Sequence, residues 1–132
     1  QMKALEEITA DRLRVWDAYH SAFAQLEAEE FLRRPAVPNE CQHNAHMYFV
    51  ILNKKFDRAH VIYEMAMKGV QVVSHYVPLH NSPAGRKFGR FSGSMVVTNE
   101  IAASLIRLPL YYGMEDANIQ RVVEGLYEVL CS

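Results

Sequence analysis

The stretch His46-Met47-Tyr48-Phe49-Val50-Ile51-Leu52 is an aromatic and β-branched run with the length of one strand. Its apolar residues follow one another with little polar alternation, which is typical of a strand covered on one face or on both. We therefore predict a central strand over residues 46–52. Residues 53–56 then turn the chain away from it.

A capped helix and a second strand are expected after this first strand. Asp57 is suited to cap a helix that runs to about Lys68 and stops at Gly69. Residues 70–76 are rich in β-branched side chains and alternate weakly, which predicts the second strand. We place four residues of the helix on its core face: Ala59, Ile62, Tyr63 and Ala66.

The chain before the first strand has the pattern of one long amphipathic helix over residues 2–30, because apolar residues recur there at three- and four-residue steps. Pro35 and Pro38 prevent the helix from continuing, since a proline ring removes a donor and clashes with the preceding turn. We expect an extended segment there.

The second half of the chain predicts one loop, two helices and a short extended segment. Residues 78–97 combine prolines, glycines and serines without clear periodicity, which indicates either an irregular functional loop or a disordered one. Thr98 can cap a helix, Pro109 places its extended segment at a sheet edge, and Asp116 can cap a last amphipathic helix over residues 114–130. The order of elements predicts an α+β fold with a small antiparallel or mixed sheet of two or three strands and about four helices.

Composition narrows the classes of partner. The chain has 132 residues with 14 Lys and Arg against 15 Asp and Glu, so it offers no field that would attract nucleic acid or an anionic membrane. Cys41 and Cys131 form no CxxC pair, which favours reduced thiols in a cytoplasmic protein. We expect a single domain over residues 1–132. Because Gln1 begins it close to a helical pattern, we expect a piece of a longer protein, with a native start at Met2 as the alternative.

Four histidines flank the predicted strands. His43 and His46 lie at the start of the first strand, and their three-residue offset points them to opposite faces of an extended chain, so we expect no metal site. His75 and His80 bracket a segment where the second strand enters the loop, a position that projects polar groups into a cleft. The alternative is a strand end with solvated histidines.

The basic residues offer a second kind of candidate contact. Arg86, Lys87 and Arg90 lie in the predicted loop, where they either contact phosphate or only favour solubility. The lysines are expected on polar helix faces, in turns or in this loop. None is expected in the buried apolar setting that lowers a lysine pKa for Schiff-base chemistry.

Four motifs together resemble the C-terminal region of the DegT/StrS family of PLP-dependent sugar aminotransferases. They are HNAHMY at residues 43–48, HYVPLH at 75–80, SPAG at 82–85 and LPLY at 108–111. Their order and spacing match over nearly the whole chain. The resemblance implies the small C-terminal domain of a fold-type I PLP transferase. The large domain, with the PLP pocket and the Schiff-base lysine, would lie outside this chain.

The resemblance also implies an activity for the full-length protein. That protein would be a homodimer that uses pyridoxal phosphate to transfer an amino group, typically from glutamate, to a dTDP-linked 4-keto-6-deoxy sugar. This chain alone would bind no PLP and would be inactive. The alternative is a free-standing α+β ligand-binding or regulatory module.

The resemblance makes seven positions candidate contacts of the substrate, and three of them match the family segment near the sugar nucleotide. His75, Tyr76 and His80 would contact the sugar nucleotide, with the histidines donating hydrogen bonds to sugar or phosphate oxygens. The other four are Asn44 and His46 in the motif where the first strand begins, with a structural role of that motif as the alternative, and Arg86 and Lys87 as candidates for the pyrophosphate. No catalytic residue is assigned.

Overall fold

A computed structural model describes residues 4–132 of the chain, so the part of the predicted first helix at Met2 and Lys3 lies outside the described residues. The helices are α1 (Leu5–Ala22), α2 (Ala24–Ala28), α3 (Arg58–Met67), the 3-10 helix η2 (Leu79–Asn81), α4 (Pro83–Phe88), α5 (Val96–Ser104) and α6 (Asp116–Cys131). The strands are β1 (Leu32–Arg33), β2 (Tyr48–Leu52), β3 (Val73–Ser74) and β4 (Leu105–Leu108). The α+β class predicted from the sequence is confirmed.

The sheet is antiparallel throughout, with the strand order β1-β2-β4-β3. It has one strand more than the two or three expected, because the chain pairs Leu32 with Leu52 directly before the proline-rich segment. β4 lies in the middle of the sheet, so the expectation of an edge strand at Pro109 is wrong. Pro109 follows the last paired residue, Leu108, and therefore removes no hydrogen bond from the ladder.

The first helix is interrupted at Phe23, where the backbone has φ −88° and ψ 7°. Hydrogen bonds of helical spacing continue across the interruption, since the Phe23 N–H donates to Tyr19 and the Phe23 carbonyl accepts from Glu27. The predicted range is therefore helical over most of its length, but it forms two helices, α1 and α2, instead of one. Asp57 does cap α3, because its side chain accepts a hydrogen bond from the Ala59 N–H at 3.0 Å.

Two other details of the helices differ from expectation. On α3 the buried residues are Val61 and Met65. Of the four residues assigned to the core face, Ile62 is half-buried, whereas Ala59, Tyr63 and Ala66 are exposed. The helix packs on α6, and that contact selects which of its two apolar faces is buried. Asp116 is the first residue of α6 and caps nothing, because its carboxylate instead pairs with Arg14 at 2.6 Å.

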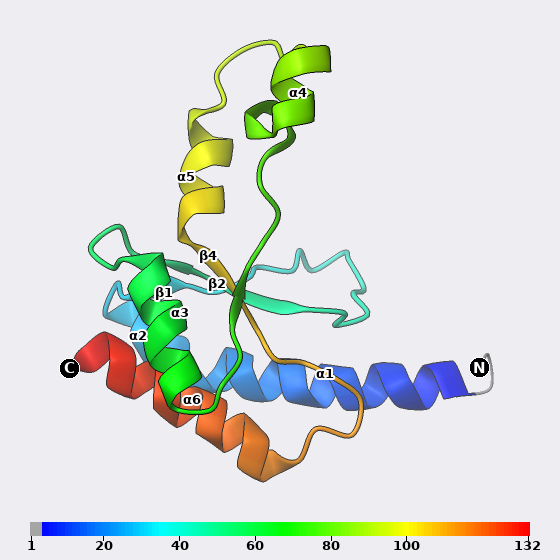
Figure 1. Cartoon of the computed structure of the whole chain (residues 1–132). Coiled ribbons are helices and arrows are strands. Elements are labelled where there is room, and N and C mark those ends of the chain that lie inside the picture. The colour runs from blue at the N-terminus through cyan, green and yellow to red at the C-terminus, as the bar shows by residue number, and fades with distance from the viewer. Residues whose placement is uncertain (1–3) are drawn as a thin grey trace.

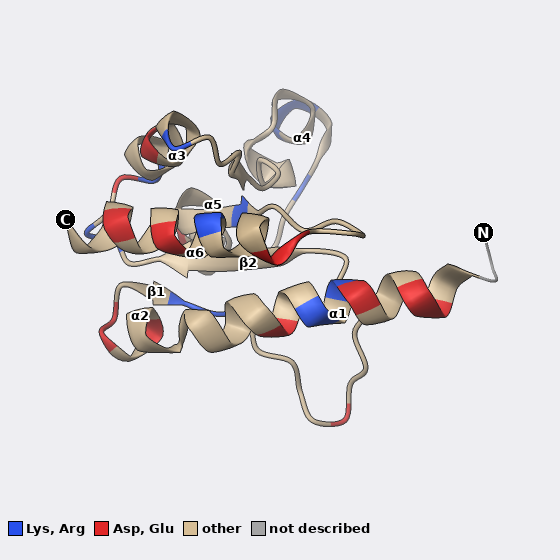
Figure 2. Ribbon diagram, turned by 90° about the horizontal axis from the view of Figure 1, so that it is seen from below, with Lys and Arg blue, Asp and Glu red and all other residues tan. Residues whose placement is uncertain are grey.

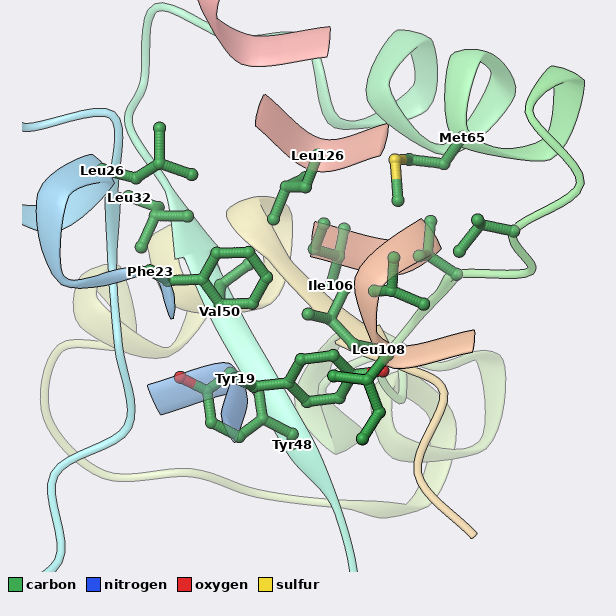
Figure 3. Packing of buried hydrophobic residues seen from close by; sticks show 14 of the residues in the cluster. Tyr19, Phe23, Leu26, Leu32, Tyr48, Val50, Met65, Ile106, Leu108 and Leu126 are labelled. Atoms are coloured by element: carbon green, nitrogen blue, oxygen red, sulfur yellow. The ribbon is translucent and has the colours of Figure 1, made fainter. Parts of the chain in front are cut away.

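The core of the molecule lies where α1, α3 and α6 meet the sheet. α1 and α6 lie side by side, with acidic and basic residues mixed along them (Figure 1 and Figure 2). Figure 3 shows Tyr19, Tyr48 and Leu126 packed with neighbours from the strands, all three of them fully buried. The Tyr19 hydroxyl donates to the Pro109 carbonyl at 2.9 Å, which satisfies a polar group inside the core.

The segment between β3 and β4 projects away from this core (Figure 1). We call residues 75–104 the arm, and residues 4–74 and 105–132 the body. The irregular loop predicted for residues 78–97 is largely helical, because it holds η2, α4 and the start of α5. α5 begins at Val96 after Met95, so Thr98 is inside the helix and does not cap it.

Candidate functional site

The structure divides the seven sequence-predicted residues between two places. Five of them, His75, Tyr76, His80, Arg86 and Lys87, lie in the arm. The other two, Asn44 and His46, lie in the body, in the loop that leads into β2.

The arm is held in shape by short-range contacts around α4. The Ser82 hydroxyl accepts from the Gly85 N–H at 2.9 Å and donates to the Leu79 carbonyl at 2.8 Å, so one side chain links η2 to α4. Pro83 occupies the first turn of α4, where its missing N–H costs nothing. A Cβ atom on Gly85 would lie 1.6 Å from the Leu79 carbonyl oxygen, so this position admits only glycine.

His80 belongs to a hydrogen-bonded group with Asn81 and Asn99. The Asn99 side-chain oxygen accepts from Asn81 at 2.6 Å and lies 2.9 Å from the Nε2 atom of His80. Because that oxygen can only accept, Nε2 carries the proton, and Nδ1 of the neutral ring is an acceptor. The arm therefore fixes the tautomer of His80.

A cavity of about 520 Å³ lies beside His80 between η2, α4 and the segment that leads to α5. Its walls are mainly apolar, with Leu79, Phe88 and Phe91 among them, and Arg90 is the cation that lines it. The Phe91 ring lies 5.5 Å from the His80 ring, centroid to centroid. An imidazole and a guanidinium on an apolar wall suit a ligand with polar oxygens beside an apolar face.

The two predicted cations of α4 do not line this cavity. Arg86 and Lys87 lie in the last turn of α4 and are exposed, and the Lys87 ammonium is 5.0 Å from the centroid of the Phe88 ring. Sequence reasoning grouped Arg90 with them but left it out of the candidate set. A helical reading of residues 83–88 would have separated Arg90, which follows the end of α4, from the two helical cations.

His75 and Tyr76 lie at the base of the arm. Their rings are 4.6 Å apart. The Nδ1 atom of His75 is buried and has no hydrogen-bond partner within residues 4–132, whereas the Tyr76 side chain is 79% exposed. The pair thus combines an unsatisfied ring nitrogen with a phenol that faces solvent.

Asn44 and His46 form a local turn in the body. The Asn44 side-chain oxygen accepts from the His46 N–H at 3.2 Å and lies 3.1 Å from its Nδ1 atom, and Ala45 between them has a positive φ of 47°. This oxygen is therefore used inside the loop. His46 also lines a cavity of the body, separate from the arm cavity.

No lysine among residues 4–132 is placed for Schiff-base chemistry. Lys54 pairs with Glu100 at 2.9 Å, Lys68 pairs with Glu128, and Lys55 lies over the Phe31 ring at 3.9 Å. All of the described lysines are exposed residues. The chain as described therefore does not fit a PLP aldehyde, which needs a buried amine of lowered pKa.

The described residues also contain neither a cluster of metal ligands nor a membrane-spanning helix. Residues 4–132 hold no group of three or more His, Cys, Asp or Glu side chains that could bind a metal ion. The ring of His43, a residue considered as a metal ligand, packs edge-to-face with the Trp16 ring, with 4.6 Å between the two ring centroids. None of the helices in this part of the chain is long and apolar enough to cross a membrane.

Comparison with solved structures relates the whole fold to aminotransferases. NtdA from Bacillus subtilis, solved with bound cofactor PMP, superposes with a TM-score of 0.86 at 24% identity and covers 100% of this chain and 30% of NtdA. The aminotransferase TlmJ from Streptoalloteichus hindustanus gives a TM-score of 0.84 at 22% identity, covering 99% of this chain and 34% of TlmJ. The body and the arm together thus form a fold shared with one part of these enzymes.

Relatives found by sequence match this chain over a similar fraction of their own length. The dTDP-3-amino-3,4,6-trideoxy-alpha-D-glucose transaminase of Micromonospora megalomicea is 26% identical, and an uncharacterized protein of Methanocaldococcus jannaschii is 27% identical. Each match covers 98% of this chain and 34% of the relative, so the chain spans about a third of their length. The model of the DegT/DnrJ/EryC1/StrS aminotransferase family matches residues 1–127. This match over nearly the whole chain confirms the resemblance seen in the motifs, and the chain belongs to the DegT/DnrJ/EryC1/StrS aminotransferase family.

Proposed function

We propose that this chain is the C-terminal part of a PLP-dependent sugar aminotransferase, and that its arm forms one wall of the substrate site. The observation that carries the proposal is the exposed apolar face of the arm. Its large exposed hydrophobic residues are Tyr76, Val77, Leu79, Phe88, Phe91, Val96 and Val97. Apolar surface on this scale marks a binding or interaction site, and the relatives are about three times as long as this chain.

The larger part of the proposed protein would cover this face and hold the PLP. The lysines of residues 4–132 support that division, because none of them is buried. PLP would supply the carrier chemistry for the amino group, while this chain would supply contacts to the sugar nucleotide. We further propose that the full-length protein is a homodimer.

The tautomer of His80 refines the proposed contacts. Since Nε2 is committed to Asn99, the neutral ring offers Nδ1 as an acceptor for a sugar hydroxyl. A protonated ring would instead donate Nδ1–H to a phosphate oxygen. The exposed Tyr76 hydroxyl can both donate and accept, and Arg90 adds a cation on the wall beside His80.

The proposed substrate is a dTDP-linked 4-keto-6-deoxy sugar with glutamate as the amino donor. Membership of the family and the name of the Micromonospora relative support a dTDP-sugar. Asn44, His46, Arg86 and Lys87 stay predicted contacts, with Arg86 and Lys87 placed toward the pyrophosphate.

Titration with PLP tests whether the cofactor binds outside this chain. We expect this chain to give no protein-bound PLP absorbance, and the longer protein encoded by its gene to give one. A 132-residue chain that binds PLP and converts a keto sugar would overturn the proposal. A gene that encodes only this stretch would favour the free-standing ligand-binding module.

Variants of the longer protein test the arm. Tyr76→Phe and His80→Asn should raise KM for the sugar nucleotide by roughly tenfold, because each removes a polar contact, and should leave KM for glutamate unchanged. His60→Asn is the matched control, since His60 is exposed on α3 in the body. An unchanged KM for the sugar nucleotide in both arm variants would show that the arm is not part of the substrate site.

A further inference from the structure

A second cavity, of about 500 Å³, lies in the body, and His46 is the one residue of its lining that the proposed function also uses. It opens to solvent and is lined by the extended segment at Val70, by the end of β4 and by the first half of α6, including Val122. These segments come from three parts of the chain that the fold brings together (Figure 1). The cavity is therefore a product of the body's tertiary structure.

The charges that line this cavity are all positive. Arg107 on β4 and Arg121 on α6 both line it, and no Asp or Glu residue does. Neither arginine takes part in any ion pair among residues 4–132. Asp116, at the start of α6, pairs at 2.6 Å with Arg14 and with neither of these two arginines. The two guanidinium groups thus lack a counter-charge within the described chain.

Arg107 also has a hydrogen-bond donor without a partner. Its Nε–H is buried and has no hydrogen-bond partner within residues 4–132. A buried donor without a partner is costly, and native structures normally satisfy it with protein, water or a ligand. The strand fixes the backbone on which this side chain stands, because Arg107 pairs with Phe49 on one side and Val73 on the other.

The remaining walls suit an anion with an apolar body. Gln71 and Asn118 add amide N–H donors to the lining, and Leu108 and Val122 add apolar surface. Apolar walls strengthen the attraction between a guanidinium and an oxyanion, because they exclude water. The planar guanidinium fork matches a carboxylate or a phosphate with two parallel hydrogen bonds.

We propose that this cavity is a binding site for a small ligand that carries a carboxylate or a phosphate next to an apolar group, with Arg107 and Arg121 holding the oxyanion. The site lies in the body, is separate from the arm cavity and extends beyond the proposed function. The site needs neither PLP nor the remainder of a longer protein. Its test is therefore independent of the tests of the proposed function.

NMR titration of the ¹⁵N-labelled 132-residue chain tests the site. The probes are benzoate and phenyl phosphate, which carry the two oxyanions on the same aromatic body. We expect saturable shifts at the Arg107 Nε–H and at the amides of Gln71, Asn118 and Arg121. The probe that binds more tightly assigns the oxyanion.

Three variants decide whether the arginines bind the probe. Arg107→Gln and Arg121→Gln should each weaken binding by about tenfold, because each removes one charge-assisted contact. Arg33→Gln is the matched control, since Arg33 is exposed on β1 and lies outside the cavity lining, and it should leave binding unchanged. Arg121 is exposed on α6, so its variant keeps the test available if Arg107→Gln unfolds.

Two results would overturn the proposal. One is the absence of saturable shifts at the cavity with either probe. The other is equal affinity in the original chain, Arg107→Gln and Arg121→Gln, which would assign the shifts to general attraction by surface cations.

Discussion

The body and the arm contain similar apolar side chains but use them in different ways. Every residue of the buried hydrophobic cluster lies in the body, whereas η2, α4 and α5 bury none of theirs. Phe23 in the body is fully buried, and Phe88 in the arm is 78% exposed. Apolar composition alone therefore does not define a core, because a core also needs elements on both sides.

The two regions also differ in what maintains their shape. The body is held by packing between α1, α3, α6 and the sheet. The arm is held by Ser82, by the close approach at Gly85 and by the Asn99 group, and it is tied to the body by the Lys54–Glu100 pair. Local contacts therefore hold the arm in shape, whereas the packing of buried apolar side chains holds the body.

The largest effect is expected from truncating the core. Leu126→Ala should lower the free energy of unfolding by about 2–5 kcal/mol, because it leaves a cavity among fully buried side chains. Phe88→Ala in the arm should change it by less than about 0.5 kcal/mol, since the ring is mostly in solvent. Urea unfolding followed by circular dichroism measures both. Similar losses in the two variants would break the distinction between body and arm.

A glycine in the arm should give a local effect of intermediate size. Gly85→Ala puts a Cβ atom 1.6 Å from the Leu79 carbonyl oxygen, so η2 and α4 must separate at a local cost of about 1–3 kcal/mol. Backbone chemical shifts of residues 79–89 should move toward random-coil values, while the amides of β2 keep theirs. Unchanged shifts in α4 would show that the arm does not depend on this approach.

A glycine-to-alanine substitution in the body should stabilise the fold, whereas the one in the arm should destabilise it. A Cβ atom on Gly125 in α6 would lie 3.5 Å from the Met65 sulfur, which is ordinary van der Waals contact. Gly125→Ala should raise the free energy of unfolding by about 0.5–1 kcal/mol, because alanine is the better helix residue. Thermal unfolding measures the change, and a lower midpoint would mean that the contact between α3 and α6 tolerates no added atom.

The smallest effect concerns the pH dependence of the body. Burial of the His20 ring, and secondly the charge of Arg34, lower the pKa of His20 in the folded chain. Because the unfolded chain takes up the proton first, the stability from neutral His20 is present above pH about 6.5 and is lost as the pH falls. Acidification from pH 7.5 to 5.5 should therefore destabilise the original chain more than His20→Gln, by less than about 1 kcal/mol.

Urea midpoints at both pH values measure this difference. The stacking of His20 on Trp16 at 4.6 Å is lost at either pH in the variant, so only the difference between the two pH values reports the titration. Equal pH dependence in the two chains would contradict the lowered pKa.

Part of the candidate site was predictable from sequence. HYVPLH marked residues 75–80 because imidazoles and a phenol gather where a strand ends, and in the structure that segment runs from the base of the projecting arm to η2 beside α4. The fixed tautomer of His80 was not predictable, since it depends on Asn99, nineteen positions away in the chain. Arg107 and Arg121 gave no sequence signal at all, because they line one cavity only after β4 and α6 have packed together.

The sequence by itself determined the elements whose signals are local. The α+β class, the strand at Tyr48–Leu52 and the Asp57 cap followed from periodicity, β-branching and a short polar side chain at a helix start. Only the tertiary structure decided that β4 lies inside the sheet, that Met65 and not Tyr63 faces the core, and that residues 78–97 form a helical arm. The physical reason is that strand order, the choice of helix face and exposure depend on partners distant in sequence.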